Sequence, residues 1–177
     1  MTSARMIIYK IPAAFVVASA VPTAAEIATG FFQGWIDEQS AVEVALAKVE
    51  RGTVLNEAEE RLAFLLSDEF DQVQDILSDL AREVSDEREN DRYWLCMALA
   101  WLRRNQAHCP DPLGVIELLY ADFDYPPEIE GLVRYMPQPP GAEPGTSGIE
   151  HRWGVYVERA LATYSLRESS VQRETES

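Results

Sequence analysis

Ten carboxylates lie between residues 68 and 91, and they are the densest set of chemically active side chains in the sequence. The same stretch carries only two arginines. Like charges four residues apart destabilise a helix by a few tenths of a kcal/mol per pair, and a face with no further role usually interleaves lysine. The pattern therefore predicts a docking surface for a basic protein partner, and the alternative is a face that only confers solubility. The residues spaced three or four apart are Asp68, Asp71, Asp75, Asp79, Glu83 and Asp86, and the first five are the predicted partner-binding residues.

A second acidic group lies among aromatic residues in the segment 117–141. Glu128 and Glu130 follow two prolines at an expected helix start, where the helix dipole favours negative charge. Asp122 and Asp124 stand at the end of the preceding helix, where the dipole disfavours them. We therefore add Asp122 and Asp124 to the predicted partner-binding residues.

The sequence contains no arrangement typical of a metal site or a catalytic site. Cys96, Cys109, His108 and His151 match none of the paired zinc-ligand spacings. Residues 122–124 resemble the first ligands of a calcium loop, but the glycine and the closing glutamate are missing. There is also no glycine-rich phosphate loop, no H-E-x-x-H and no nucleophile elbow. We expect no metal, no cofactor and no enzymatic activity.

The overall charge restricts the classes of partner. A formal net charge of −15 argues against binding to nucleic acid or to an anionic membrane, since both repel such a surface. No apolar run approaches the length of a bilayer span. The first 20 residues resemble a signal peptide with Ala18-Ser19-Ala20 as its cleavage site, but Pro12 interrupts the apolar run. We expect a cytoplasmic protein, and export with a mature start near Val21 is the alternative.

Helical periodicity runs through almost the whole chain, and no strand of any length is predicted. We expect an all-α fold, a compact bundle of about seven to eight helices in a single domain over residues 1–165. Thr23, Ser40, Asn56 and Asp111 are expected helix caps. One helix is expected over 69–84, and the wholly apolar segment 93–102 predicts a central helix.

Three further segments complete the predicted organisation. The helix after Asn56 is expected to turn Leu62, Leu65 and Leu66 inward, because they share a helical spacing. Residues 137–148 are rich in proline and glycine and predict a loop. The tail 166–177 is polar and is expected to be disordered.

Two motifs in the second half resemble an uncharacterised bacterial family, a domain of unknown function. They are "WLCMALAWL", which resembles a W-L-x-x-x-L-x-W-L helix, and the segment from Tyr120 to Pro137, which resembles Y-A-D-F-D-Y-P-x-x-I-x-x-x-V-R-Y-M-P. The stretch "EIATGFFQGWI" resembles the N-terminal portion of the same family, so the resemblance spans about residues 11 to 165. The family is similar to the small acidic helical immunity proteins that accompany bacterial toxins.

The resemblance and the charge pattern together favour an immunity or antitoxin-type inhibitor of a basic toxin domain. Such a protein would bind through the aspartates on the helix over 69–84, helped by Asp122 and Asp124. The alternative is a helical structural or regulatory adaptor, whose partner binds the 137–148 loop or the C-terminal tail.

Overall fold

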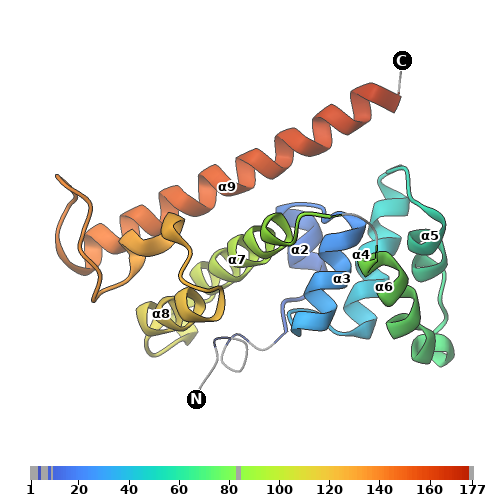
Figure 1. Ribbon diagram of the computed structural model, residues 1–177, viewed down its shortest axis with the longest axis horizontal. Helices are drawn as coiled ribbons and strands as arrows, with labels where there is room; N and C mark the ends of the chain where they lie inside the picture. The colour runs from blue at the N-terminus through green and yellow to red at the C-terminus, as the bar shows by residue number, and fades with distance from the viewer. Residues whose placement is uncertain (1–3, 5–7, 9, 83–84, 176–177) are drawn as a thin grey trace.

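The computed structural model describes residues 4, 8, 10–82 and 85–175, with side chains up to residue 168. This part of the chain is all-helical, which confirms the predicted fold class (Figure 1). It holds eight α-helices and three short 3-10 helices, against the seven to eight helices expected in all.

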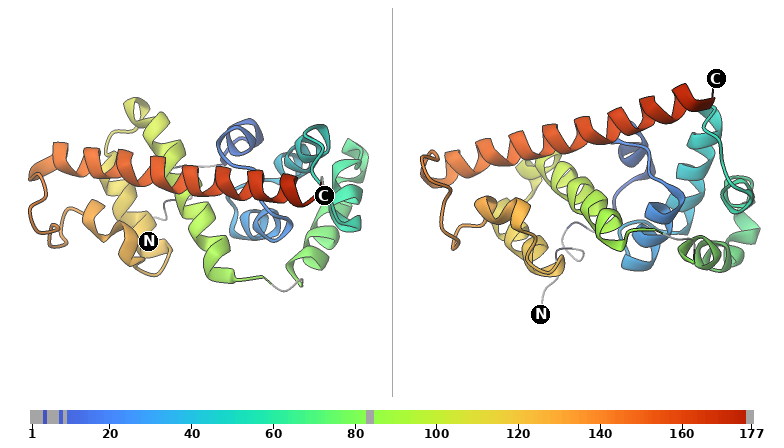
Figure 2. Two further views of the ribbon diagram at one scale, coloured as in Figure 1. Left: turned by 90° about the horizontal axis from the view of Figure 1, so that it is seen from above. Right: turned by 45° about the horizontal axis from the view of Figure 1, so that its top comes forward.

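The helices form two groups along the long axis of the molecule (Figure 1). One group is α2 to α6 with η1, and the other is α7, α8, η2 and η3, while α9 runs past both (Figure 2). A single apolar core continues through both groups and includes residues of every α-helix. The elements are α2 (Ala13–Ser19), α3 (Ala24–Gln33), α4 (Glu38–Glu50), α5 (Glu57–Ala63), η1 (Ser67–Gln72), α6 (Val73–Ala81), α7 (Glu87–Arg104), η2 (Gln106–His108), α8 (Pro112–Asp122), η3 (Pro127–Leu132) and α9 (Gly145–Thr175).

Helix α7 is the central helix that the apolar segment predicts. Its residues Tyr93 and Trp94 are buried and also donate hydrogen bonds to the backbone of neighbouring segments. The Tyr93 hydroxyl donates to the carbonyl of Ala20 at 2.6 Å, and the indole N–H of Trp94 donates to the carbonyl of Glu26 at 2.7 Å. These bonds join α7 to the first group of helices.

Gly30 allows α3 to approach α7 closely. A Cβ atom built on Gly30 would lie 2.0 Å from the Trp94 ring, which is fully buried. The ring therefore packs directly on the α3 backbone, and no larger residue fits there without moving the two helices apart. Gly34, with a φ of 84°, then ends α3 in the left-handed conformation.

Residues 11–21 belong to the folded body. Ile11 and Val16 are fully buried in the core, and Val21 is nearly so. The N–H of Ile11 also donates to the carbonyl of Trp35 at 2.9 Å. A chain that began near Val21 would lack α2 and these core contacts.

Helix α9 is longer than the sequence patterns indicate. It begins at Gly145, inside the expected 137–148 loop, and continues to Thr175, through the segment expected to be disordered. The physical reason is a contact distant in sequence: Arg167 pairs with Glu26, and its guanidinium also lies over the rings of Tyr93 and Tyr164. These contacts hold the distal part of α9 against the first group of helices.

The segment from Asn56 to Ala81 also differs from its prediction. Asn56 caps α5 as expected, but α5 ends at Ala63, and the chain turns before η1. Leu62 is buried and Leu65 is half-buried, whereas Leu66 is 64% exposed, so the predicted inward position of Leu66 is wrong. The helix expected over 69–84 is split into η1 and α6, and residues 83 and 84 lie outside the described part.

Candidate functional site

Four of the predicted aspartates form an exposed acidic face on η1 and α6. Asp68 and Asp71 lie in the 3-10 helix, where residues three apart stand above each other. From Asp71, steps of four lead to Asp75 and Asp79 on α6, so the stripe continues on one side of the two elements. All four side chains are exposed. Glu83, the fifth predicted member, lies outside the described residues.

The carboxylates of this acidic face have almost no cationic partners. Asp79 pairs with Arg82 at 3.3 Å, and both of those side chains are more than half exposed. Asp68, Asp71 and Asp75 form no ion pair with any residue that the structure describes. The inward side of α6 carries Val73, Ile76, Leu77 and Leu80, all buried, so the core holds the face in position.

Two exposed apolar side chains adjoin the acidic face, and the sequence patterns assign neither of them to the site. Phe64 and Leu66 are each 64% exposed, on the turn between α5 and η1. Exposed glutamates of α5, Glu57 and Glu60, lie on the other side of this turn. Three consecutive apolar residues at 64–66 were the available signal, because one helical face cannot bury all three.

Asp122 and Asp124 do not join the acidic face. Asp122 ends helix α8 and Asp124 lies in the turn after it. Helices α8 and α6 lie apart along the long axis in Figures 1 and 2. Asp122 is half-buried and accepts the backbone N–H of Ala4 at 2.9 Å, which gives it a structural contact. Asp124 and Tyr125 take positive φ angles of 56° and 59° in the turn that ends α8. Their place in the proposed docking surface therefore lacks geometric support.

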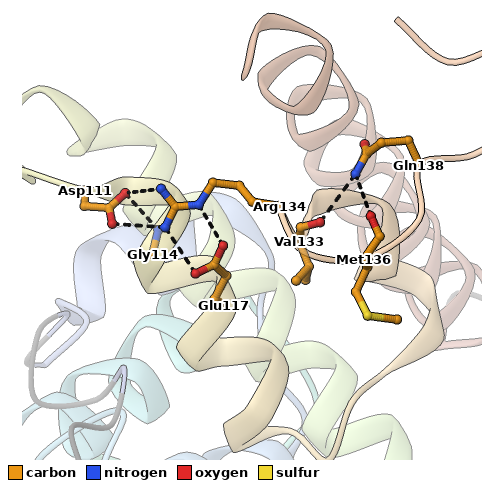
Figure 3. Close-up of polar contacts among 7 residues, drawn as sticks. All are labelled: Asp111, Gly114, Glu117, Val133, Arg134, Met136 and Gln138. Carbon is orange, nitrogen blue, oxygen red and sulfur yellow. Dashed lines mark hydrogen bonds and ion pairs between the residues drawn. The ribbon is translucent and has the colours of Figure 1, made fainter. Parts of the chain in front are cut away.

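Arg134, within the same 117–141 segment, is the centre of a network of charged side chains (Figure 3). Arg134 donates to both oxygens of Asp111 and both oxygens of Glu117, at 2.7 to 3.2 Å. Hydrogen bonds from Arg134 to Glu117 and Asp111 raise the pKa of the guanidinium. The pKa of Asp111 is lowered by the Gly114 N–H that it caps and then by Arg134. The network joins the chain after η3 to the start of α8, which is a structural role.

A second group of charges is buried where α3, α4, α5 and α9 meet. Lys48 of α4 pairs with Glu59 of α5, and both side chains are about 5% exposed. Glu26 of α3, at 2% exposure, accepts hydrogen bonds from Arg167 at 2.8 and 3.0 Å. Lys48, Glu59 and Arg167 line a cleft of about 270 Å³. The sequence patterns did not identify these pairs, since only the capping roles of Glu26 and Glu59 are local, whereas their cations come from other helices.

The surroundings of Cys96, His108 and His151 do not favour catalysis or metal binding. Burial raises the pKa of the Cys96 thiol to about 12, so the thiol is protonated at neutral pH and is a poor nucleophile or metal ligand. His108 and His151 are both exposed. Among the residues with described positions, no three His, Cys, Asp or Glu side chains gather closely enough to hold a metal ion.

These features define an acidic, all-helical protein whose exposed carboxylates lie on a rigid support. The chain belongs to a bacterial family described as "Uncharacterized protein conserved in bacteria (DUF2247)", whose model matches residues 13–161. The match includes α2, which is consistent with the core contacts of that helix. No curated protein and no solved structure matches the chain. None of the helices in the described part is both long enough and apolar enough to cross a bilayer.

Proposed function

We propose that this chain is a non-enzymatic binding protein, an immunity or antitoxin-type inhibitor of a basic bacterial toxin domain. The observation that carries the proposal is the acidic face, where Asp68, Asp71 and Asp75 are exposed and form no ion pair with a described residue. A folded protein usually gives exposed carboxylates cationic neighbours, because these reduce the repulsion between them. The resemblance to small acidic immunity proteins that we expect from the sequence motifs favours the same function.

In the proposed mechanism the acidic face attracts and covers the basic surface of the toxin. Complementary charge accelerates association, and the effect weakens as salt screens it. The position of the face on packed helices favours binding with little rearrangement of this chain. The inhibitor needs no catalytic group, since occlusion of the toxin's site is sufficient.

The test begins with capture of partners from the native bacterium at low and at high salt. Each captured basic protein is then expressed with and without this chain, and growth is measured. We expect at least one such protein to be toxic alone and harmless together with this chain. A captured set with no toxic member neutralised by the chain contradicts the proposal.

Charge-reversed variants locate the binding surface. Asp71→Lys/Asp75→Lys is expected to slow association with the toxin and to flatten its salt dependence. Glu150→Lys/Glu158→Lys is the matched control, because it makes the same change of net charge at exposed positions of α9. Equal effects of the two variants would mean that net charge alone matters and that the assigned face is wrong.

A deletion variant tests the alternative function as a helical adaptor. Residues 137–141 are exposed. Arg152 anchors this part of the chain, because it donates hydrogen bonds to the side-chain oxygen of Gln138 and to the backbone carbonyl of Glu143. If removal of residues 139–142 abolishes capture of the partner while the fold is retained, the adaptor function replaces the inhibitor function.

A further inference from the structure

Phe64 and Leu66 project outward from a turn whose backbone is held at several points. The N–H of Phe64 donates to the carbonyl of Glu60 at 3.3 Å, and the N–H of Leu66 donates to the Glu69 carboxylate at 3.0 Å. Leu65, between them, packs against the core. Phe64 and Leu66 are each 64% exposed and Leu65 is half-buried, so the three side chains alternate outward, inward and outward along the turn.

This alternation means that the core uses only one of the three apolar residues. Leu65 supplies the contact with the core, so neither Phe64 nor Leu66 is needed to bury apolar surface within the chain. Single exposed apolar residues are common on protein surfaces, but two on one held turn make a small apolar projection with little freedom to lose on binding. An exposed aromatic residue on a rigid support is typical of the residues that dominate binding energy at interfaces.

The surroundings of this apolar corner, Phe64 and Leu66, indicate the chemistry of its partner. Glu57 and Glu60 lie on the α5 side, Asp68 and Asp71 lie on the η1 side, and all four are exposed. Arg61 is the exposed cation of α5 within this region. A matching surface therefore has an apolar centre with lysine or arginine around it.

We infer that the apolar corner is the anchor of a docking surface for a basic, amphipathic protein surface, which receives Phe64 and Leu66 in an apolar depression. This inference rests on the proposed function and specifies the partner of the same site. The acidic face accelerates the approach of the partner, and the apolar corner slows its dissociation once water is excluded around the two side chains.

Two synthetic peptides test the inference on the full chain. One is an amphipathic helix of leucine and lysine, and the other has alanine in place of every leucine, which keeps the charge and the helical propensity. Binding is measured by fluorescence anisotropy of labelled peptide. We expect the chain to bind the leucine peptide roughly tenfold more tightly than the alanine peptide, which is the preference that one moderate apolar anchor supplies.

Matched variants assign this preference to the corner. Phe64→Ser/Leu66→Ser is expected to remove it and to leave binding of the alanine peptide unchanged. Val54→Ser/Leu166→Ser is the control, since it removes two apolar side chains that are each 70% exposed elsewhere. The inference is overturned if the unmodified chain shows no preference, if the preference survives in Phe64→Ser/Leu66→Ser, or if the control variant loses it equally.

Two further measurements distinguish the apolar corner from the acidic face and from a self-association surface. Asp71→Lys/Asp75→Lys is expected to weaken binding of both peptides. If neither peptide binds more weakly, the role of the acidic face in binding is contradicted. The comparison of the leucine and alanine peptides still tests the apolar corner in that case. Sedimentation measures whether the chain self-associates. If Phe64→Ser/Leu66→Ser converts a dimer to a monomer, the corner binds a second copy, and the inferred basic partner is overturned.

Discussion

Carboxylates occupy two contrasting environments in this protein. Where α3, α4, α5 and α9 meet, Glu26 and Glu59 are almost completely buried, and each accepts hydrogen bonds from a cation and from a helix-capping backbone N–H. On η1 and α6, Asp68, Asp71 and Asp75 are exposed and have no cationic partner among the described residues.

The difference separates structural charges from charges that are available for binding. A buried carboxylate that loses its cation is left unpaired in a poorly solvated site, so the fold depends on the pair. An exposed carboxylate is solvated by water, and its removal costs the fold little. If this contrast holds, substitutions in the two regions have effects of very different size on the free energy of unfolding.

The largest effect is expected at the Lys48–Glu59 pair. Lys48→Met keeps most of the side-chain volume but leaves the buried Glu59 carboxylate without its cation, and we expect a loss of about 3 kcal/mol in the free energy of unfolding. Urea denaturation at neutral pH measures this loss. The double variant Lys48→Met/Glu59→Gln removes the unpaired charge and should recover much of the stability. Equal stability of Lys48→Met and the unmodified chain would contradict the assigned structural role.

A smaller loss is expected at Arg167, which is a third exposed and can exchange its partner for water. Arg167→Gln should reduce the free energy of unfolding by about 2 kcal/mol, and hydrogen exchange should show less amide protection at residues 160–168 of α9. Glu168→Gln is the control, since its 3.6 Å pair with Arg51 lies at the surface. If the two variants show the same exchange, Arg167 does not hold the end of α9.

Asp37, which caps α4, is intermediate in burial between the carboxylates of the two regions. Burial raises the pKa of its carboxyl, but hydrogen bonds from Ser40 and the nearby Lys10 charge bring it below its ordinary value of 3.8. A carboxyl with a lowered folded-state pKa stabilises the fold above the unfolded-state pKa, and this contribution disappears as pH falls through the folded-state value. Asp37→Ala should therefore cost about 1 kcal/mol at pH 7 and less near pH 3.

The pH dependence at Asp37 needs a variant that keeps the cap. Asp37→Asn retains an oxygen acceptor for the Ser40 N–H, which lies 2.8 Å from Asp37 in the unmodified chain, but it does not titrate. Urea denaturation from pH 7 to pH 3 should show the difference between Asp37→Ala and Asp37→Asn changing little with pH. If the stability difference between Asp37→Ala and the unmodified chain grows toward low pH, the lowered folded-state pKa is contradicted.

The features predicted correctly from the sequence are local ones. Thr23, Asn56 and Asp111 each cap a helix through a bond to the residue three positions later, so their role is visible within four residues of sequence. The predicted cap at Ser40 is wrong, because α4 begins at Glu38 and Asp37 is its cap, with the Ser40 N–H donating to the Asp37 carboxylate. The central helix α7 followed from its wholly apolar composition.

The features that could not be predicted depend on contacts between distant residues. Glu26 and Arg167 are 141 residues apart, and Asp122 and Ala4 are 118 apart, so no spacing rule connects them. The contact between Arg167 and Glu26 holds α9 beyond its expected end. The contact between Asp122 and Ala4 gives Asp122 a structural role. The acidic face was visible because a periodic stripe depends only on its own helices, whereas the exposure of Phe64 and Leu66 depends on where α5 ends.

The smallest effect is expected on the acidic face itself, and its sign is opposite to the others. Asp79 lies one helical turn after Asp75 on α6, so Asp75→Asn removes one repulsive α-helical pair, worth a few tenths of a kcal/mol at low ionic strength. It also removes the repulsion from Asp71, which lies four residues earlier on η1. The variant should be slightly more stable than the unmodified chain in urea denaturation at low salt, and the gain should fade as salt screens the repulsion. Asp79→Asn, which also loses the Arg82 pair, should gain less. A clear loss of stability in Asp75→Asn would show that its carboxylate supports the fold, and the distinction between the two regions would then fail.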